Sequence, residues 1–195
     1  MDVITLAFAI LFTAMTAVVV PVYVVNYGPS NFLWFSDIAL IGVLAALWLE
    51  NAFIASMMAL AVLLPEVLWV VSFLSGLFFG RTVSTLAAYM FDPGIPRYLR
   101  ALSLFHLALP PALLWLLHRY GYDPRALAAQ TVAAWIVLPA SLAFAPPEKN
   151  VNWVRGFGHP PASPLPARWH FWAMMLAYPL LVYVPTHFLL SAVFG

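Results

Sequence analysis

The feature that most constrains the fold is a series of apolar runs, each long enough to cross a lipid bilayer. Residues 3–25 carry no charged side chain, and comparable runs recur along the chain. About 20 helical residues cross the roughly 30 Å of hydrocarbon in a bilayer. Of the 195 residues, 65% are hydrophobic and 8% are charged, which is outside the range of soluble domains. The sequence therefore predicts an all-α fold, a polytopic transmembrane helical bundle.

Turn residues and polar connections divide these runs into about six spans that form a single transmembrane domain over residues 1–195. The spans are predicted at residues 3–25, 31–49, 52–79, 97–117, 126–145 and 168–194. Pro65 predicts a kink or a break near the centre of the third span. The first span lacks a basic segment before its apolar run and shows no clear cleavage site, so we expect it to be retained rather than removed as a signal peptide.

Basic residues are distributed unevenly between the loops at the two ends of the predicted bundle. One end, called the basic end below, holds Arg81, Arg97, Arg100, Lys149, Arg155 and Arg168, whereas the other holds only Arg119 and Arg125. Cytoplasmic loops of membrane proteins are enriched in lysine and arginine. We therefore expect the basic end to be cytoplasmic and both termini to be non-cytoplasmic.

Charge and composition exclude several classes of function. The net charge of +1, without a dense basic cluster, argues against a nucleic-acid partner. Membrane lipids are the expected partners, and membrane protein partners or a homo-oligomer stay open. The absence of cysteine removes disulfides and thiol nucleophiles. The five histidines are scattered without HExxH or HxxxH spacing, so neither a metal site nor a haem or other cofactor is expected.

Three ionisable side chains, those of Asp37, Glu66 and His106, are expected inside the hydrocarbon layer. A charged group there costs about 2.5–3.5 kcal/mol on insertion scales, so each needs a partner or a polar cavity. At about 1.5 Å of rise per residue, Asp37 and His106 lie below the basic-end loops and Glu66 lies near the midplane. We expect the three to share one cavity that opens toward the basic end. His187, near the far end of its span, is expected to be interfacial or to pack between helices.

The fourth span carries a polar stripe, because Arg100, Ser103 and His106 recur at three-residue spacing on one helix face. One interpretation is structural, with Arg100 forming an ion pair with Asp37 that lowers the cost of both charges. The other is functional. His106 would then accept or donate a proton, since imidazole titrates near neutral pH, and would activate Ser36 or a water molecule.

Three segments carry a resemblance to a known family: Asn-Phe-Leu-Trp-Phe-Ser-Asp-Ile at 31–38, His-Leu-Ala-Leu-Pro at 106–110 and Asn-Val-Asn-Trp at 150–153. Together they resemble the bacterial YwaF-like integral membrane proteins. That group is similar to the eukaryotic androgen-inducible membrane hydrolases, six-helix enzymes that split fatty acid esters of hydroxy fatty acids. The resemblance implies a multi-pass protein of the bacterial inner membrane.

Carried over by residue, the resemblance places the family's histidine on His106, a few residues before a proline. The family's threonine or cysteine nucleophile, early in the second span, has no direct counterpart here. The nearest positions are Trp34 and Ser36, of which only Ser36 has the chemistry. Asn152 resembles an asparagine in the loop before the last helix, where it would orient a headgroup or donate to an oxyanion.

Three functional hypotheses follow. In the first, the protein is a lipid ester hydrolase or acyltransferase in which Ser36 attacks, His106 is the base and Asp37 orients or stabilises charge, while Glu66, Asn152 and Arg100 bind the substrate. In the second, it is a non-enzymatic subunit of a larger membrane complex, and its polar groups tie helices together. In the third, it is a small carrier with Glu66 as its proton site.

Overall fold

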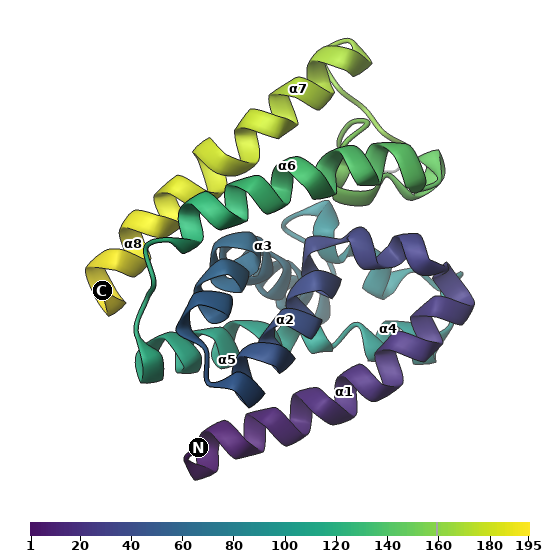
Figure 1. The fold of residues 1–195 in the computed structure, drawn as a ribbon. Helices are drawn as coiled ribbons and strands as arrows, with labels where there is room; N and C mark the ends of the chain where they lie inside the picture. Colours follow the sequence, from purple (N-terminus) through teal and green to yellow (C-terminus); the bar gives the residue numbers. More distant parts are fainter. Residues whose placement is uncertain (159) are drawn as a thin grey trace.

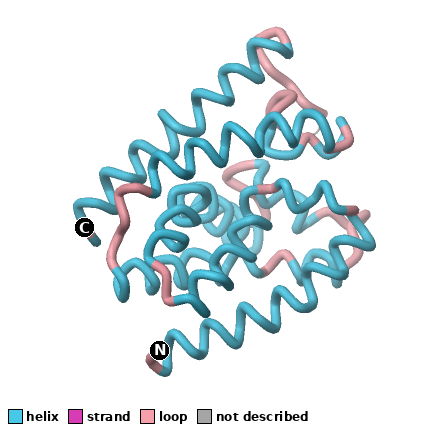
Figure 2. Tube along the Cα trace, viewed as in Figure 1, coloured by secondary structure: helices cyan, strands magenta, loops and turns pink. Residues whose placement is uncertain are grey.

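The computed structural model describes residues 1–158 and 160–195, and helices dominate it (Figure 2). The helices are α1 (Val3–Tyr27), α2 (Phe35–Leu49), α3 (Ala52–Phe79), α4 (Arg97–Leu102), α5 (Phe105–Tyr120), α6 (Ala126–Phe144), α7 (Ala167–Ala177) and α8 (Val184–Phe194). Short 3₁₀ segments lie at Pro29–Leu33, Thr85–Phe91, Pro147–Lys149 and Val151–Trp153. A π-helical segment, Tyr178–Tyr183, joins α7 to α8, and Pro179 lies inside it. No strand forms in the two described ranges; Phe157 and Ala162 make one isolated bridge.

Five helical segments are long and apolar enough to cross a membrane: α1, α3, α4 with α5, α6, and α7 with α8. The prediction of an all-α transmembrane bundle is therefore confirmed, and the chain is an integral membrane protein. The second predicted span is shorter than expected, because residues 29–33 form a 3₁₀ segment that starts at a proline and α2 begins only at Phe35. Its 15 residues extend about 22 Å, less than the hydrocarbon thickness.

The N- and C-termini lie at the same end of the bundle (Figure 1). The N-terminal amine is 2.8 Å from Glu50 Oε1 at the end of α2, and the amide of Tyr122 donates to the carbonyl of Phe194 at 3.0 Å. At the opposite end, the Tyr98 hydroxyl donates to Asn26 Oδ1 at 2.8 Å. The short helix α2 therefore still connects the two ends of the bundle. Of the six spans predicted, five are long and apolar enough to cross a membrane in the described residues, and α2 is not.

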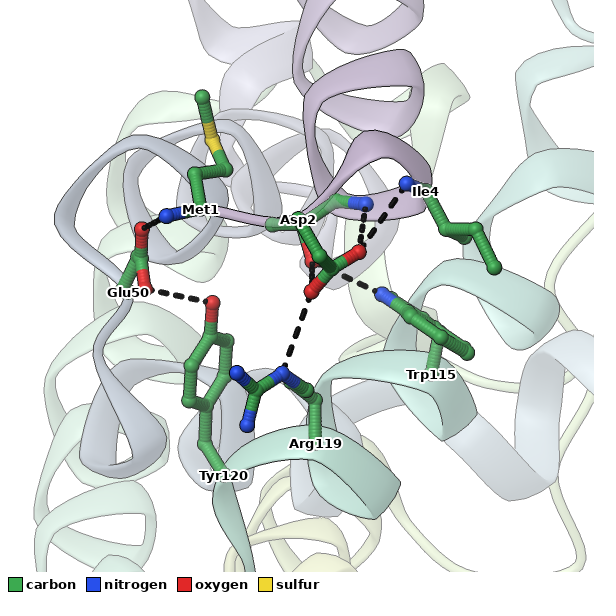
Figure 3. Close-up of polar contacts among 8 residues, drawn as sticks. Met1, Asp2, Ile4, Glu50, Trp115, Arg119 and Tyr120 are labelled. Atoms are coloured by element: carbon green, nitrogen blue, oxygen red, sulfur yellow. Dashed lines mark hydrogen bonds and ion pairs between the residues drawn. The ribbon is translucent and has the colours of Figure 1, made fainter.

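Polar contacts near the N-terminus fix the start of α1 (Figure 3). Asp2 caps the helix by accepting hydrogen bonds from the amides of Ile4 and Thr5, and Arg119 Nε donates to its second carboxylate oxygen at 3.1 Å. Trp115 Nε1 donates to the Thr5 hydroxyl at 3.0 Å. The hydrogen bond from the Thr5 amide, helped by its hydroxyl and by Arg119, lowers the pKa of Asp2 to about 2. These contacts join α1 to the end of α5.

The central helix is α3, which contacts α2, α5, α6 and the segment Thr85–Phe91. Fully buried alanines on the facing surfaces of α2 and α3, including Ala39, Ala46, Ala55 and Ala59, let these helices approach closely. Figure 1 shows α6 side by side with α7 and α8, forming a layer next to the α2–α3 pair. This arrangement leaves a polar cavity between α1, α2, α3 and α5 at the basic end.

Candidate functional site

The cavity has a volume of about 640 Å³ and is lined on the loop side by residues of the connection between α6 and α7. Five of the polar residues singled out in the sequence line it: Ser36, Asp37, Glu66, His106 and Asn152. The expectation that Asp37, Glu66 and His106 share one cavity near the basic end therefore agrees with the structure. Arg100 is not among the residues that line it.

The strongest polar contact in the cavity joins Glu66, at the middle of α3, to His106, in the first turn of α5. His106 Nδ1 lies 3.0 Å from Glu66 Oε1 and 2.8 Å from Oε2. The Glu66 side chain is 4% exposed and that of His106 12% exposed, so the pair is shielded from solvent. Desolvation makes a carboxylate costly inside a membrane protein unless a partner of this kind is present.

Two aromatic rings hold the imidazole of His106 in place. The Phe105 ring is stacked on it at a centroid distance of 4.2 Å, and the Trp69 ring at 4.5 Å. With Nδ1 directed at the carboxylate of Glu66, the second ring nitrogen, Nε2, has no hydrogen-bond partner in the described part of the chain. A histidine held at Nδ1 by a carboxylate has the arrangement that general bases use.

The helix α3 continues through Pro65, so of the two alternatives predicted there, a kink or a break, the break does not occur. Proline has no amide hydrogen, and this leaves the carbonyl of Ala61, four residues earlier, without its usual intrahelical donor. Both Ala61 and Pro65 line the cavity next to Glu66. The proline therefore removes one hydrogen bond of the helix beside the cavity without interrupting the helix.

Asp37, in the first turn of α2, is 3% exposed. Its Oδ2 accepts a hydrogen bond of 2.9 Å from Asn31 Nδ2, whereas Oδ1 is buried and has no hydrogen-bond partner among the described residues. Counted from the turn between α2 and α3 at about 1.5 Å per residue, Asp37 lies about 18 Å and Glu66 about 21 Å away. The two carboxylates are therefore at nearly the same depth.

The predicted ion pair between Arg100 and Asp37 is wrong. Arg100 Nη1 donates instead to the carbonyl of Met90 at 2.9 Å, and its Nε is buried without a partner. The prediction that Arg100, Ser103 and His106 form a stripe on one helix face assumed one continuous helix. In the structure α4 ends at Leu102 and α5 begins at Phe105. Arg100 contacts the segment Thr85–Phe91 and does not itself line the cavity.

Ser36 lies in the first turn of α2 and faces the cavity. No hydrogen bond joins it to His106 within the described ranges, so the predicted serine–histidine pair is not formed in this conformation. The first-turn amides of Ser36 and Asp37 have no intrahelical acceptor. The other cavity serine, Ser103, has its hydroxyl 2.8 Å from that of Tyr23.

Asn152, from the loop before α7, serves as the cap that α2 otherwise lacks. Its Oδ1 accepts from the amide of Phe35 at 3.2 Å, while Nδ2 donates to the carbonyl of Leu33 at 2.7 Å and to Ser141 Oγ at 3.0 Å. Both amide hydrogens are thus already used. Asn152 therefore has no free donor for the expected contact with a headgroup or an oxyanion. Its hydrogen bonds fix the start of α2 at the cavity.

Sequence reasoning did not pair Glu66 with His106, and it did not pair Asn31 with Asp37. The pairing joins positions 40 residues apart and leaves no local pattern. A weak signal existed in the aromatic neighbours, since Trp69 follows Glu66 by three residues and Phe105 adjoins His106.

Two further histidines, His170 and His187, form contacts outside the cavity. His187 Nδ1 lies 2.7 Å from the Tyr122 hydroxyl near the termini, where an interfacial histidine was expected. His170 contacts the hydroxyl of Ser163 and the carbonyl of Trp153. No group of three His, Asp or Glu side chains near enough to hold a metal ion occurs in residues 1–158 and 160–195, and His159 lies outside them.

Comparison of the chain with protein-family models, with curated proteins and with solved structures gives no match. Function therefore has to be inferred from the cavity and its chemistry.

Proposed function

We propose that the protein is a membrane lipid ester hydrolase or acyltransferase whose general base is His106, oriented by Glu66. The observation that carries this proposal is the contact of His106 Nδ1 with both carboxylate oxygens of Glu66, in a cavity at membrane depth. A carboxylate at Nδ1 fixes the tautomer that leaves Nε2 able to accept a proton. Positioned acid–base groups of this kind typically accelerate reactions by about 10²–10⁴-fold.

In the proposed reaction, the Ser36 hydroxyl attacks the carbonyl carbon of a lipid ester and its proton passes to His106 Nε2. The tetrahedral intermediate then breaks the bond to the alcohol oxygen, which takes the proton from His106. Water completes hydrolysis of the acyl-serine, or a second hydroxyl completes transfer, each activated by His106. Catalytic hydrogen bonds are often long before substrate binds, so the missing bond between Ser36 and His106 is compatible with this role.

The start of α2 supplies the electrostatic part of the mechanism. The free amides of Ser36 and Asp37 point out of a helix N-terminus, where the helix dipole favours negative charge. They are suited to stabilise the oxyanion that develops on the carbonyl oxygen. Asn152 contributes by accepting a hydrogen bond from the first amide of α2, that of Phe35. This contact also fixes the position of the next two amides, those of Ser36 and Asp37.

The surroundings favour a lipid substrate over a water-soluble one. Aromatic side chains line the cavity from several elements, among them Tyr23, Trp69, Phe105 and Tyr178. The resemblance to YwaF-like proteins and androgen-inducible hydrolases supports the same class of substrate. The resemblance also supports placement in a bacterial inner membrane. The basic residues in the basic-end loops support a cytoplasmic position for that end, with the cavity accessible from the cytoplasm and both termini outside it.

A proton-coupled carrier is the second candidate, because an acid–histidine pair near mid-membrane suits a proton site. It predicts pH-driven solute flux in vesicles and no covalent intermediate. A non-enzymatic subunit predicts neither solute flux nor labelling of a serine, and its native partners would purify with it.

The test is labelling by a long-chain alkyl fluorophosphonate on protein reconstituted in nanodiscs. We expect the wild type to be labelled, and Ser36→Ala and His106→Ala to lose labelling while remaining folded. Ser103→Ala is the matched control, because its hydroxyl also lines the cavity but is engaged by Tyr23, and it should keep labelling. An unlabelled, folded wild type, or a fully labelled Ser36→Ala, would contradict a serine nucleophile.

A further inference from the structure

One oxygen in the cavity lacks the partner that its burial demands. Asp37 Oδ1 is buried without a hydrogen bond among the described residues, although the other oxygen of the same carboxylate is held by Asn31. A buried polar group without a hydrogen-bond partner destabilises the fold, and more so when it is charged. Asp37 lines the cavity, so a ligand bound there is placed to supply the missing group.

The other charged residues that line the cavity already have partners. Glu66 is paired with His106, and Lys149 Nζ donates to the backbone carbonyl of Tyr27. Asp92 is exposed, and its Oδ1 accepts from the amide of Gly94. Asp37 therefore leaves an uncompensated acidic group deep in the cavity, which a hydrogen-bond donor or a cation would satisfy.

The walls around this acid are aromatic. Tyr23 and Tyr27 are in edge contact at 5.2 Å, and Phe35, directly before Ser36, lies 5.1 Å from Tyr178; all four line the cavity with Asp37. Aromatic faces attract cations through the ring quadrupole, and this attraction strengthens when water is excluded. A cavity lined by both aromatic rings and a carboxylate suits an alkylammonium group.

We propose that the cavity recognises a lipid with an ammonium headgroup, and that Asp37 Oδ1 is its counter-ion. This proposal rests on the proposed function and names the substrate class of the enzyme. Asp37 lies at nearly the depth of Glu66, which is paired with His106. An ammonium headgroup bound to Asp37 therefore keeps the rest of the lipid beside His106. Asp37 then has a binding role, in place of the catalytic role that its position beside Ser36 suggested.

The test is a binding titration followed by tryptophan fluorescence, since Trp34, Trp69 and Trp153 line the cavity. The protein is held in non-ionic maltoside micelles, and four single-chain probes of equal chain length are compared: alkyltrimethylammonium, alkylphosphocholine, alkyl sulfate and the neutral alcohol. We expect saturable binding of an ammonium probe, at least tenfold tighter than that of the sulfate or the alcohol. Tighter binding of the phosphocholine would indicate a phospholipid headgroup, and tighter binding of the alkyltrimethylammonium a simple lipid amine.

Asp37→Asn keeps the shape of the side chain and is expected to weaken binding of the ammonium probe at least tenfold. Asp92→Asn, at an exposed acid on the same cavity, should bind within twofold of wild type. Equal binding by Asp37→Asn and wild type would overturn the proposal, as would equal affinity of the wild type for the cationic and neutral probes. The titration is repeated in Ser36→Ala. Ammonium binding there, combined with failure of fluorophosphonate labelling in the wild type, would refute the esterase and leave the ammonium site standing.

Discussion

Replacing Glu66 with glutamine is expected to slow fluorophosphonate labelling of the protein by about 100-fold or more. Glutamine keeps the size of the side chain but can present its amide group to His106 Nδ1, which removes the carboxylate that fixes the tautomer. Nε2 would then no longer be reliably available as a base. The measurement is the labelling rate in nanodiscs at fixed probe concentration.

The control for this variant is Glu148→Gln, at an exposed acid in the turn Pro147–Lys149. It makes the same chemical change outside the cavity and should label at the wild-type rate. A Glu66→Gln protein that labels as fast as wild type would show that the carboxylate does not assist His106.

Replacing Asn152 with alanine is expected to lower the free energy of unfolding by about 3 kcal/mol, the largest stability effect that the site predicts. Loss of a helix cap costs about 0.5–2 kcal/mol, and the buried groups of Leu33 and Phe35 lose their partners as well. Asn152 also has a positive φ of 52°, which asparagine tolerates better than alanine. For a chain of this size, the melting midpoint should fall by roughly 6–12 °C.

Asn26→Ala tests whether this effect is specific, because the Asn26 side chain makes only exposed hydrogen bonds, one to a carbonyl of its own helix and one from the Tyr98 hydroxyl. It should melt close to wild type. A melting midpoint of Asn152→Ala within about 2 °C of wild type would mean that α2 does not depend on the cap from the α6–α7 loop.

The helices could be predicted from sequence because hydropathy and turn residues act locally. The limits of α3 agree with the prediction, since its ends are marked by Asn51 and by Gly80. The start of α2 was missed because Pro29 begins a separate 3₁₀ segment, and the apolar pattern does not distinguish this from another helical turn.

The contents of the cavity could be predicted better than its contacts. Depth along each helix was enough to group Asp37, Glu66 and His106, since a polar group in a membrane needs a shared polar space. The choice of partners depends on helix rotation and on the break between α4 and α5. That break sends Arg100 to Met90 and leaves Glu66 as the partner of His106.

The most direct test of the central claim, that Glu66 and His106 act as one base, is a double-mutant cycle of fluorophosphonate labelling rates. The rates of Glu66→Gln, His106→Gln and the double variant are compared with wild type in folded protein. If the two residues form a unit, each single variant loses at least 100-fold and the double variant is little slower than the slower single variant. Losses that multiply in the double variant, or a single variant with the wild-type rate, would contradict the account.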